Sequence, residues 1–386
     1  MVDEIKIVDG QAVDEIYKLA QTAFQKEPTG GKAALQLRVE HSHNYVFLTH
    51  GKLMSQVLAT PFMINFYGTQ YAADGIGYVA SYPQNRGKGA INQLMAQILL
   101  DEYANGVVVS YLAPFSYQFY ARYGYTQLFT QTKTTVASAD FPAVQAKTGA
   151  VKVLTFAEAL PILKVLYAQY RPFQCGALQR EDWWWQCFYQ LRMPDVQIAI
   201  YFDEDKHAQG YLLTRIEGDT YVIKEWVALN YGAVAGLTKF VGEAASAVTA
   251  IEFTSPEAGN TPTSFTQLLA EPVAKQEILP YMQGRIVNLT AFLATYPFLQ
   301  NVGSIQFEVV DAVAPWNNGT FTLGQPTAAT SIVLKGQIEA ITELLFGYQN
   351  LANLVFTGSI QLSDLTVIEA LMADLPTHAP VLPDYF

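Results

Sequence analysis

Apolar residues near the start of the chain follow first helical spacing and then strand spacing. Between residues 13 and 24 they lie on one face of an expected amphipathic helix. Apolar runs at 45–49, 55–66 and 75–80 predict strands, with Gly51 and Lys52 as the turn between the first two. A glycine-containing loop, a helix with an apolar face at 91–99 and a buried strand at 107–112 follow. This order predicts a mixed α/β layer.

A second segment loosely repeats this order after a polar connector near residues 139–150. Its expected elements are a helix at 156–170, strands at 197–202, 210–216 and 221–228, and a helix at 234–248. The glycine loop is not repeated. A third segment mixes strands at 303–310, 319–323, 331–334 and 358–362 with helices at 338–345 and 365–373. We therefore predict an α/β (α+β) protein with domains at 1–145, 146–278 and 279–386.

Composition and charge narrow the classes of function. The 386 residues are 51% hydrophobic and 15% charged, which suits several packed cores and not a disordered chain. A net charge of −11 argues against a large basic surface for nucleic acids and favours cationic partners. No apolar run of about 18 residues occurs, so no membrane span is expected. Two cysteines, Cys175 and Cys187, and the lack of a secretory pattern predict a cytoplasmic protein.

The loop after the strand at 75–80 carries the strongest chemical pattern. It contains Gln84-x-x-Gly87-x-Gly89, with Arg86 and Lys88 interleaved, and it leads into a helix. Glycines let backbone N–H groups converge, the helix N-terminus adds partial positive charge, and the two cations complete a site for a pyrophosphate. Taken alone, the pattern fits a tight strand–helix turn equally well. It is neither a Walker loop nor the dinucleotide fingerprint.

A second motif follows the strand at 107–112: the pair Phe119-Tyr120 and then the pair Gly124-Tyr125. Together the two motifs resemble those of the GCN5-related N-acetyltransferase (GNAT) family, Gln/Arg-x-x-Gly-x-Gly/Ala and a Phe-Tyr pair before a Gly-aromatic pair. Over its whole length the chain resembles the Eis-like (enhanced intracellular survival) acetyltransferases. These have tandem GNAT-like domains, here with a degenerate second copy, and a third domain that looks like a sterol carrier protein. Tyr281 to Val287 resembles the start of that third domain.

The resemblance implies an enzyme, an N-acetyltransferase that uses acetyl-CoA as its co-substrate and needs no metal. The pantetheine arm would pair with the backbone of the strand end, and the pyrophosphate would bind the glycine loop. The residues expected to bind acetyl-CoA are Val79, Ala80, Ser81, Arg86, Gly87, Lys88, Gly89, Ala90 and Ile91.

Two catalytic residues are implied by the same resemblance. Tyr120 would lie near the thioester sulfur, where a phenol can protonate the departing thiolate. The α-carboxylate of Phe386 would reach the active site, because the proline-spaced segment 376–386 is extended. An α-carboxylate has a pKa of about 3.3–3.7 and is a weak base, so it would anchor the amine, and its role as proton acceptor stays open. Glu27 is a weaker candidate for contact with the amine and is equally well explained as a solvated loop carboxylate.

The acceptor would be a primary amine, either small or in a peptide: an aminoglycoside-like compound, a polyamine or a lysine side chain. The resemblance also implies a homo-oligomer, with a hexamer as one form. Two other functions compete with this one, a carrier of lipid or apolar ligands built on the third segment and a scaffold without catalysis. A metal site at His41 and His43 is set aside for want of further ligands. Trp183 to Trp185 are expected to pack in the core or at an interface rather than to stack on a sugar.

Overall fold

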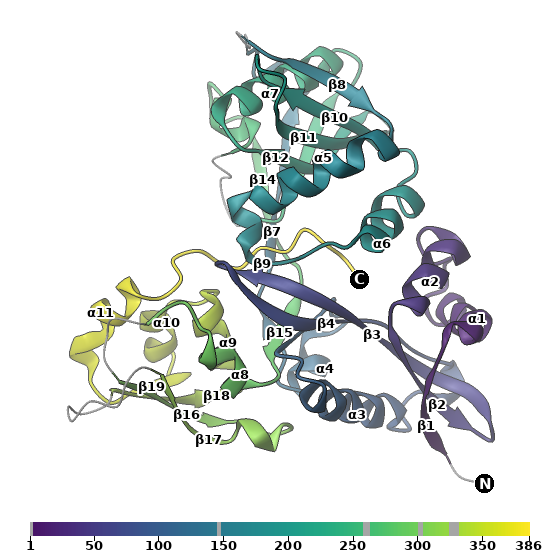
Figure 1. Ribbon diagram of the computed structural model, residues 1–386, viewed down its shortest axis with the longest axis vertical. Helices are drawn as coiled ribbons and strands as arrows, with labels where there is room; N and C mark the ends of the chain where they lie inside the picture. The colour runs from purple at the N-terminus through teal and green to yellow at the C-terminus, as the bar shows by residue number, and fades with distance from the viewer. Residues whose placement is uncertain (1–2, 145–147, 258–262, 300–303, 324–331) are drawn as a thin grey trace. The chain divides into compact units, whose positions relative to one another are not determined.

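The computed structural model describes residues 3–144, 148–257, 263–299, 304–323 and 332–386 (Figure 1). The chain divides into two compact units. The first contains Met1–Phe129, Tyr281–Pro380 and Asp384–Phe386, and the second contains Thr130–Pro280 and Val381–Pro383.

A mixed sheet forms the centre of the first unit, with the strand order β1-β2-β3-β4-β5-β15-β6 (Figure 1). The neighbours β4 and β5 are parallel and the other pairs along this path are antiparallel. The strands are β1 (Glu4–Val8), β2 (His43–Thr49), β3 (Lys52–Phe66), β4 (Thr69–Ser81), β5 (Val109–Leu112), β6 (Thr126–Gln127) and β15 (Gln283–Ile286). The strands expected from residues 45 to 112 and the turn at Gly51 are therefore confirmed.

Helices pack on both faces of this sheet. The helices α1 (Val13–Phe24) and α2 (Gly31–Glu40) share a core with Leu58 of β3. The helix α3 (Ala90–Ala104) shares a different core with Val57, the neighbouring residue of the same strand. Successive side chains of a strand point to opposite faces, so β3 is covered on both. The sequence pattern did not predict α2, because polar residues interrupt its short apolar stripe.

A second, smaller sheet of the first unit lies in the C-terminal part of the chain. Its order is β17-β16-β18-β19, formed by β16 (Ile305–Val310), β17 (Gly319–Leu323), β18 (Ile332–Gln337) and β19 (Ile360–Leu362). The helices of this part are α8 (Leu289–Ala294), α9 (Ile338–Phe346), α10 (Leu351–Phe356) and α11 (Ile368–Ala373). Residues 303 and 331, where two of the expected strands begin, lie outside the described residues. The helix α10 was not predicted.

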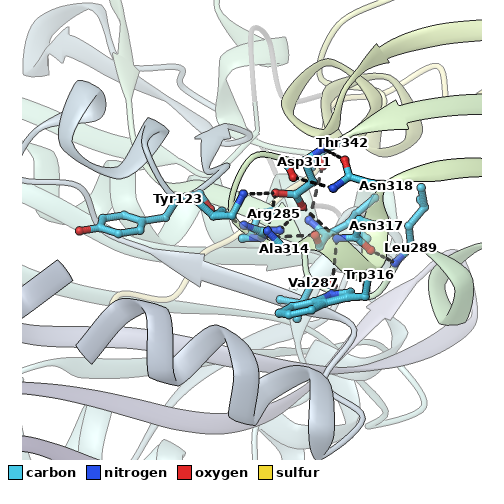
Figure 2. A network of polar contacts seen from close by, with 12 residues as sticks. Tyr123, Arg285, Val287, Leu289, Asp311, Ala314, Trp316, Asn317, Asn318 and Thr342 are labelled. Carbon is cyan, nitrogen blue, oxygen red and sulfur yellow. Dashed lines mark hydrogen bonds and ion pairs between the residues drawn. The ribbon is translucent and has the colours of Figure 1, made fainter. Parts of the chain in front are cut away.

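A buried ion pair joins the first sheet to this C-terminal part (Figure 2). Arg285 of β15 and Asp311, directly after β16, approach to 2.6 Å between Nη2 and Oδ2, with both side chains fully buried. Nη1 of Arg285 also donates to the carbonyl oxygen of Tyr123. Asp311 accepts hydrogen bonds from the backbone N–H of Ala314 and from Nδ2 of Asn317, both at 3.0 Å. The buried charges are thus paired and hydrogen-bonded, as their removal from water requires.

The second unit is built on a sheet of order β14-β7-β13-β12-β11-β10-β8. Its strands are β7 (Thr130–Ala137), β8 (Ala150–Leu154), β10 (Gln197–Phe202), β11 (Ala208–Glu217), β12 (Thr220–Ala228), β13 (Ala250–Ser255) and β14 (Lys275–Pro280). The helices α5 (Phe156–Gln169) and α7 (Tyr231–Ala245) confirm the two expected there. Trp184 and Trp185 are fully buried, which confirms their packing role, and Cys175 and Cys187 are buried as well.

No helix among the described residues is long and apolar enough to cross a membrane. Within the same residues, no group of three or more His, Cys, Asp or Glu side chains is placed to hold a metal ion.

Candidate active site

The parallel strands β4 and β5 separate from each other in the middle of the first sheet. Their pairing runs from Ala73–Val109 to Ile76–Leu112, whereas β4 continues to Ser81. In the pairing of β4 with β3, Tyr78 and Val79 stand opposite the single residue Val57, and Tyr78 has a left-handed φ of 50°. This is a β-bulge, which bends its strand and increases the local twist. The end of β4 therefore leaves β5 and opens a wedge between them.

The loop at the end of this wedge has the conformation that its glycines predict. Gly87 and Gly89 have φ of 76° and 82°, in the left-handed region where other residues are strained. Gly89 is the N-cap of α3, a helix of 15 residues. The N–H groups of its first turn have no partner within the helix and carry partial positive charge. An anion with several oxygens fits such a site.

A cavity of about 670 Å³ joins the wedge, the loop and the start of α3. The residues that line it are Ala23, Phe24, Val79, Ala80, Ser81, Asn85, Arg86, Gly87, Gly89, Ala90, Ile91, Asn92, Phe115, Phe119 and Arg122. The structure thus brings together every residue expected to bind acetyl-CoA except Lys88, which is exposed and is not among the lining residues. Glu27 is not among them either. It lies between α1 and α2, where it accepts a hydrogen bond of 2.7 Å from Tyr17 Oη.

Phe115 and Phe119 form an aromatic wall of this cavity, and Tyr120 packs against both of them. Tyr120 belongs to the short helix α4 (Tyr117–Ala121), whose N-cap Ser116 accepts a hydrogen bond from the N–H of Phe119. Its ring packs edge-on against Phe115 and Phe119, with centroids 5.2 and 5.0 Å away. Burial, followed by the neighbouring phenols of Tyr123 and Tyr385, raises the pKa of Tyr120 well above its ordinary value of 10. The phenol therefore keeps its proton throughout the physiological pH range.

The C-terminal residue is buried against β4. Phe386 is 5% exposed, and its ring lies 5.9 Å from that of Phe62 between centroids. A Cβ at Gly75 would lie 3.0 Å from the Phe386 ring. A Cβ at Gly77 would lie 3.0 Å from the carboxyl carbon of Phe386 and 2.6 Å from Arg38 Nη2. These two glycines make room for the end of the chain, and a buried guanidinium lies beside its carboxylate.

Two buried carboxyl groups lie under the site. Asp74 of β4 and Glu102 of α3 are 4% and 2% exposed. Glu102 accepts a hydrogen bond of 2.8 Å from Ser110, the residue paired with Asp74 in β5, and Ser110 is also bonded to Tyr125 Oη at 2.7 Å. Burial raises the pKa of Asp74 to about 7. Burial first, and then the charge of Asp74, raise the pKa of Glu102.

Comparison with known protein families agrees with this geometry. Residues 4–128 match an acetyltransferase (GNAT) domain, and residues 176–286 match a second acetyltransferase (GNAT) domain. Residues 289–383 match a sterol carrier protein domain. No curated protein matches the chain.

Solved structures match the whole chain. One is a conserved protein of unknown function from Enterococcus faecalis V583, a probable N-acyltransferase, with 34% identity, 100% of both chains covered and a TM-score of 0.92. A GCN5-related N-acetyltransferase from Anabaena variabilis has 19% identity, 100% of both chains covered and a TM-score of 0.86. Eis1 from Mycobacterium abscessus has 18% identity, 100% of both chains covered and a TM-score of 0.81. The last two show the likeness of fold.

A sheet parted at β4 and β5, with a glycine loop at a helix N-terminus, is the framework of an N-acetyltransferase. The chain belongs to the GNAT acetyltransferase family, in the arrangement of two acetyltransferase domains followed by a sterol carrier protein domain. The predicted Eis-like architecture is confirmed. GNAT acetyltransferases use acetyl-CoA as their co-substrate.

Several residues of the site were missed by the sequence analysis. Asn85 lies inside the glycine motif but at one of its variable positions, and it is buried. Arg38 belongs to α2, which the sequence pattern did not predict. Gly75 and Gly77 looked like ordinary strand residues, and the close approach of Phe386, together with Phe62 at Gly75 and Arg38 at Gly77, explains them. A glycine in a strand often marks the close approach of another backbone, and this was the available clue.

The raised pKa of Asp74 predicts a pH-dependent stability. Unfolded Asp74 releases its proton near its ordinary pKa of 3.8, whereas the folded protein keeps it up to about pH 7. The stability from this group is therefore full below about pH 4 and falls as the pH rises to about 7, by roughly 2 kcal/mol between pH 5 and pH 7. Asp74→Asn should flatten that fall in urea unfolding at pH 5, 6, 7 and 8.

The matched control is Asp14→Asn, at an exposed carboxylate of α1. It should follow the wild type at every pH. Equal pH dependence in Asp74→Asn and the wild type would show that Asp74 does not hold its proton in the folded state.

Proposed function

We propose that this chain transfers the acetyl group of acetyl-CoA to a primary amine in the cavity beside β4. The observation that carries the proposal is the cavity itself, which joins the open end of β4 to the glycine loop and the start of α3. Pantetheine needs an extended strand edge to pair with, and a pyrophosphate needs converging N–H groups. The wedge and the loop offer both within one cavity.

Each part of acetyl-CoA has a matching group. The backbone of Val79 to Ser81 would pair with the pantetheine arm. The N–H groups of the loop from Arg86 to Gly89 and of Ala90 and Ile91 would bind the pyrophosphate. Lys88 is exposed and would act through its charge from the edge of the loop. The aromatic wall of Phe115 and Phe119, with Tyr120 behind it, would face the thioester.

The reaction would be a direct transfer. The neutral amine attacks the acetyl carbonyl carbon, and the new C–N bond gives a tetrahedral intermediate whose oxyanion is stabilised by backbone donors. The C–S bond breaks when this intermediate collapses, and the leaving thiolate takes a proton from the Tyr120 phenol. The amine nitrogen loses one proton, which returns through water to Tyr120, so the phenol is regenerated. Burial keeps that phenol protonated, so Tyr120 has a proton to donate to the sulfur.

The carboxylate of Phe386 would anchor the acceptor. It lies beside the buried Arg38, so the charge of the guanidinium helps to hold it in place. An anchored carboxylate can bind an ammonium group and orient it, and it can pass a proton to water when the amine is released from its charged form. Aminoglycoside-like compounds, polyamines and lysine side chains all carry the required primary amine. Glu27, exposed and bonded to Tyr17, is a further candidate contact at the edge of this region.

The binding of acetyl-CoA should depend on Gly87. Gly87→Glu adds a negative charge where the pyrophosphate would bind, and we expect acetyl-CoA affinity to fall at least about tenfold, since like charges this close cost more than 1 kcal/mol. Isothermal titration calorimetry should give about one site per wild-type chain. The matched control is Gly106→Glu. Its glycine has the same left-handed φ, 77°, and open space around it, but it lies beyond the far end of α3.

Gly106→Glu should bind acetyl-CoA as the wild type does. Equal binding by Gly87→Glu would exclude the loop as the pyrophosphate site. If the wild type does not bind acetyl-CoA at all, the proposed function is wrong.

The acid role of Tyr120 predicts a loss of turnover. Tyr120→Phe should lower kcat about 100-fold, at the low end of general acid catalysis, and leave the Kd for acetyl-CoA nearly unchanged. Thiol release would be followed with any amine that the wild type acetylates. The control is Tyr117→Phe, at a more exposed phenol of the same helix. Turnover by Tyr120→Phe at the wild-type rate would remove the phenol from the mechanism.

The position of Phe386 predicts that residues added after it lower the activity. One alanine added after Phe386 moves the carboxylate away from the space beside Gly77. We expect kcat/KM for the amine to fall about 10- to 100-fold, the value of a hydrogen bond to a charged group. Phe386→Leu, which keeps the terminal carboxylate, is the control and should lose less. An extended variant with full activity and a normal melting temperature would refute the role of the tail.

A further inference from the structure

Three polar side chains, those of Ser55, Ser81 and Asn85, connect the end of β4 to the glycine loop. Ser55 of β3 is paired with Ser81 of β4, and their hydroxyl oxygens are 2.7 Å apart. Nδ2 of Asn85 donates to the hydroxyl oxygen of Ser55 at 3.2 Å. Ser81 and Asn85 both line the cavity, whereas Ser55 is fully buried behind them.

The burial of Ser55 sets the direction of these hydrogen bonds. Its oxygen accepts from Asn85, so its own hydrogen needs an acceptor. Among the hydrogen bonds of the described residues, Ser81 Oγ is the acceptor available to it. A buried hydroxyl that leaves its hydrogen unpaired loses stability. The direction is therefore Asn85 to Ser55 to Ser81.

This direction leaves the hydrogen of Ser81 free to point to the cavity. We propose that the Ser81 hydroxyl donates a hydrogen bond to an amide carbonyl of the pantetheine arm, and that Ser55 and Asn85 are positioning residues which set its polarity. The proposal rests on the proposed function, because it assumes that acetyl-CoA lies along β4. It assigns the side chain of Ser81, beyond its backbone, to recognition of the ligand.

The same three residues also couple the two halves of the binding site. Asn85 ends the short 3₁₀ turn Pro83–Asn85, and its N–H is bonded to the carbonyl oxygen of Tyr82 at 2.9 Å. Arg86 and the two left-handed glycines follow directly. The side chain of Asn85 therefore holds the start of the pyrophosphate loop against β3, at the residue that orients Ser81. Asn85 would thus support the binding of both the pantetheine arm and the pyrophosphate.

Binding measurements on single and double variants test this coupling. Ser55→Ala, Ser81→Ala and Asn85→Ala should each raise the Kd for acetyl-CoA about fivefold, the value of one hydrogen bond. Because Ser55 acts through Ser81, the double variant of these two should bind about as weakly as Ser81→Ala alone.

The chain offers a matched control for the loss of a hydroxyl pair. Ser42, just before β2, and Thr60 of β3 are hydrogen-bonded through their hydroxyl groups, with 2.8 Å between the oxygens. Neither residue lines the cavity. Ser42→Ala should leave the Kd for acetyl-CoA unchanged even if it lowers the melting temperature. A weakening of acetyl-CoA binding by Ser42→Ala as large as that by Ser55→Ala would reduce the role of Ser55 to general stability and overturn the proposal.

Asn85→Asp tests the direction of the hydrogen bonds from Asn85 through Ser55 to Ser81. An ionised carboxylate can only accept, so Ser55 would turn its hydrogen to the new carboxylate and Ser81 would turn its own to Ser55. Ser81 would then present lone pairs instead of a hydrogen. The probe is S-acetylpantetheine, which lacks the pyrophosphate and so avoids charge repulsion, with its Kd measured by ligand-observed NMR. We expect a loss of about fivefold or more.

The outcomes separate the two proposals. Unchanged binding of S-acetylpantetheine to Asn85→Asp, or unchanged acetyl-CoA binding by Ser55→Ala, overturns the assigned polarity while the proposed function stands. A wild-type protein that binds neither ligand overturns the proposed function itself.

Discussion

The parting of β4 from β5 is the constraint on which the site depends. Four residue pairs, from Ala73–Val109 to Ile76–Leu112, hold the parallel strands together, and the bulge at Tyr78 and Val79 then bends β4 away. A strand edge without its neighbour exposes N–H and C=O groups that need partners. In this protein those groups face a cavity that ends at the N-terminus of α3. The bulge thus opens a space that runs from this strand edge to the glycine loop.

Two segments late in the chain, β15 and the last residues, pack against the first sheet near this cavity. Arg285 donates to the carbonyl oxygen of Tyr123, three residues after Tyr120, and its guanidinium would be only 2.8 Å from a Cβ at Gly124. The glycine of the second motif is therefore required by the ion pair with Asp311 as well as by its left-handed φ of 75°. The end of the chain fills the space that Gly75 and Gly77 leave. Asp311 belongs to the segment that matches the sterol carrier protein domain and Phe386 lies just beyond it, so the last part of the chain packs against the first sheet.

The second unit shows what the same framework does without the loop. Its parallel pair β12–β13 also ends early, at Ile223–Phe253, and Lys224 lies at a bulge like that of the first unit. Only two residues separate β12 from α7, however, and the ring of Tyr201 lies 2.4 Å from where a Cβ of Gly236 would be. Glu225, beyond the bulge, forms a buried ion pair with Arg180 at 2.6 Å between Oε2 and Nη2. Where β12 and β13 part, a cavity of only about 120 Å³ remains, lined by Lys224, Glu225 and Glu252 among others.

The sequence by itself determined most local features: the strands of the first segment, the helices α1 and α3, the glycine loop, and the residues from Val79 to Ile91 that line the cavity, apart from Asn85. These follow from short-range physics, because periodicity sets the elements and left-handed backbone selects glycine. The sequence pattern did not predict α2, because the apolar face of this helix is short. Tertiary structure alone decided that β7 joins the second sheet and β15 returns to the first, that Arg38 lies beside Phe386, and that Ser55 lies behind Ser81 and Asn85. Those contacts join residues 26 to 348 positions apart, and no local pattern encodes which distant partner a buried charge or hydroxyl will meet.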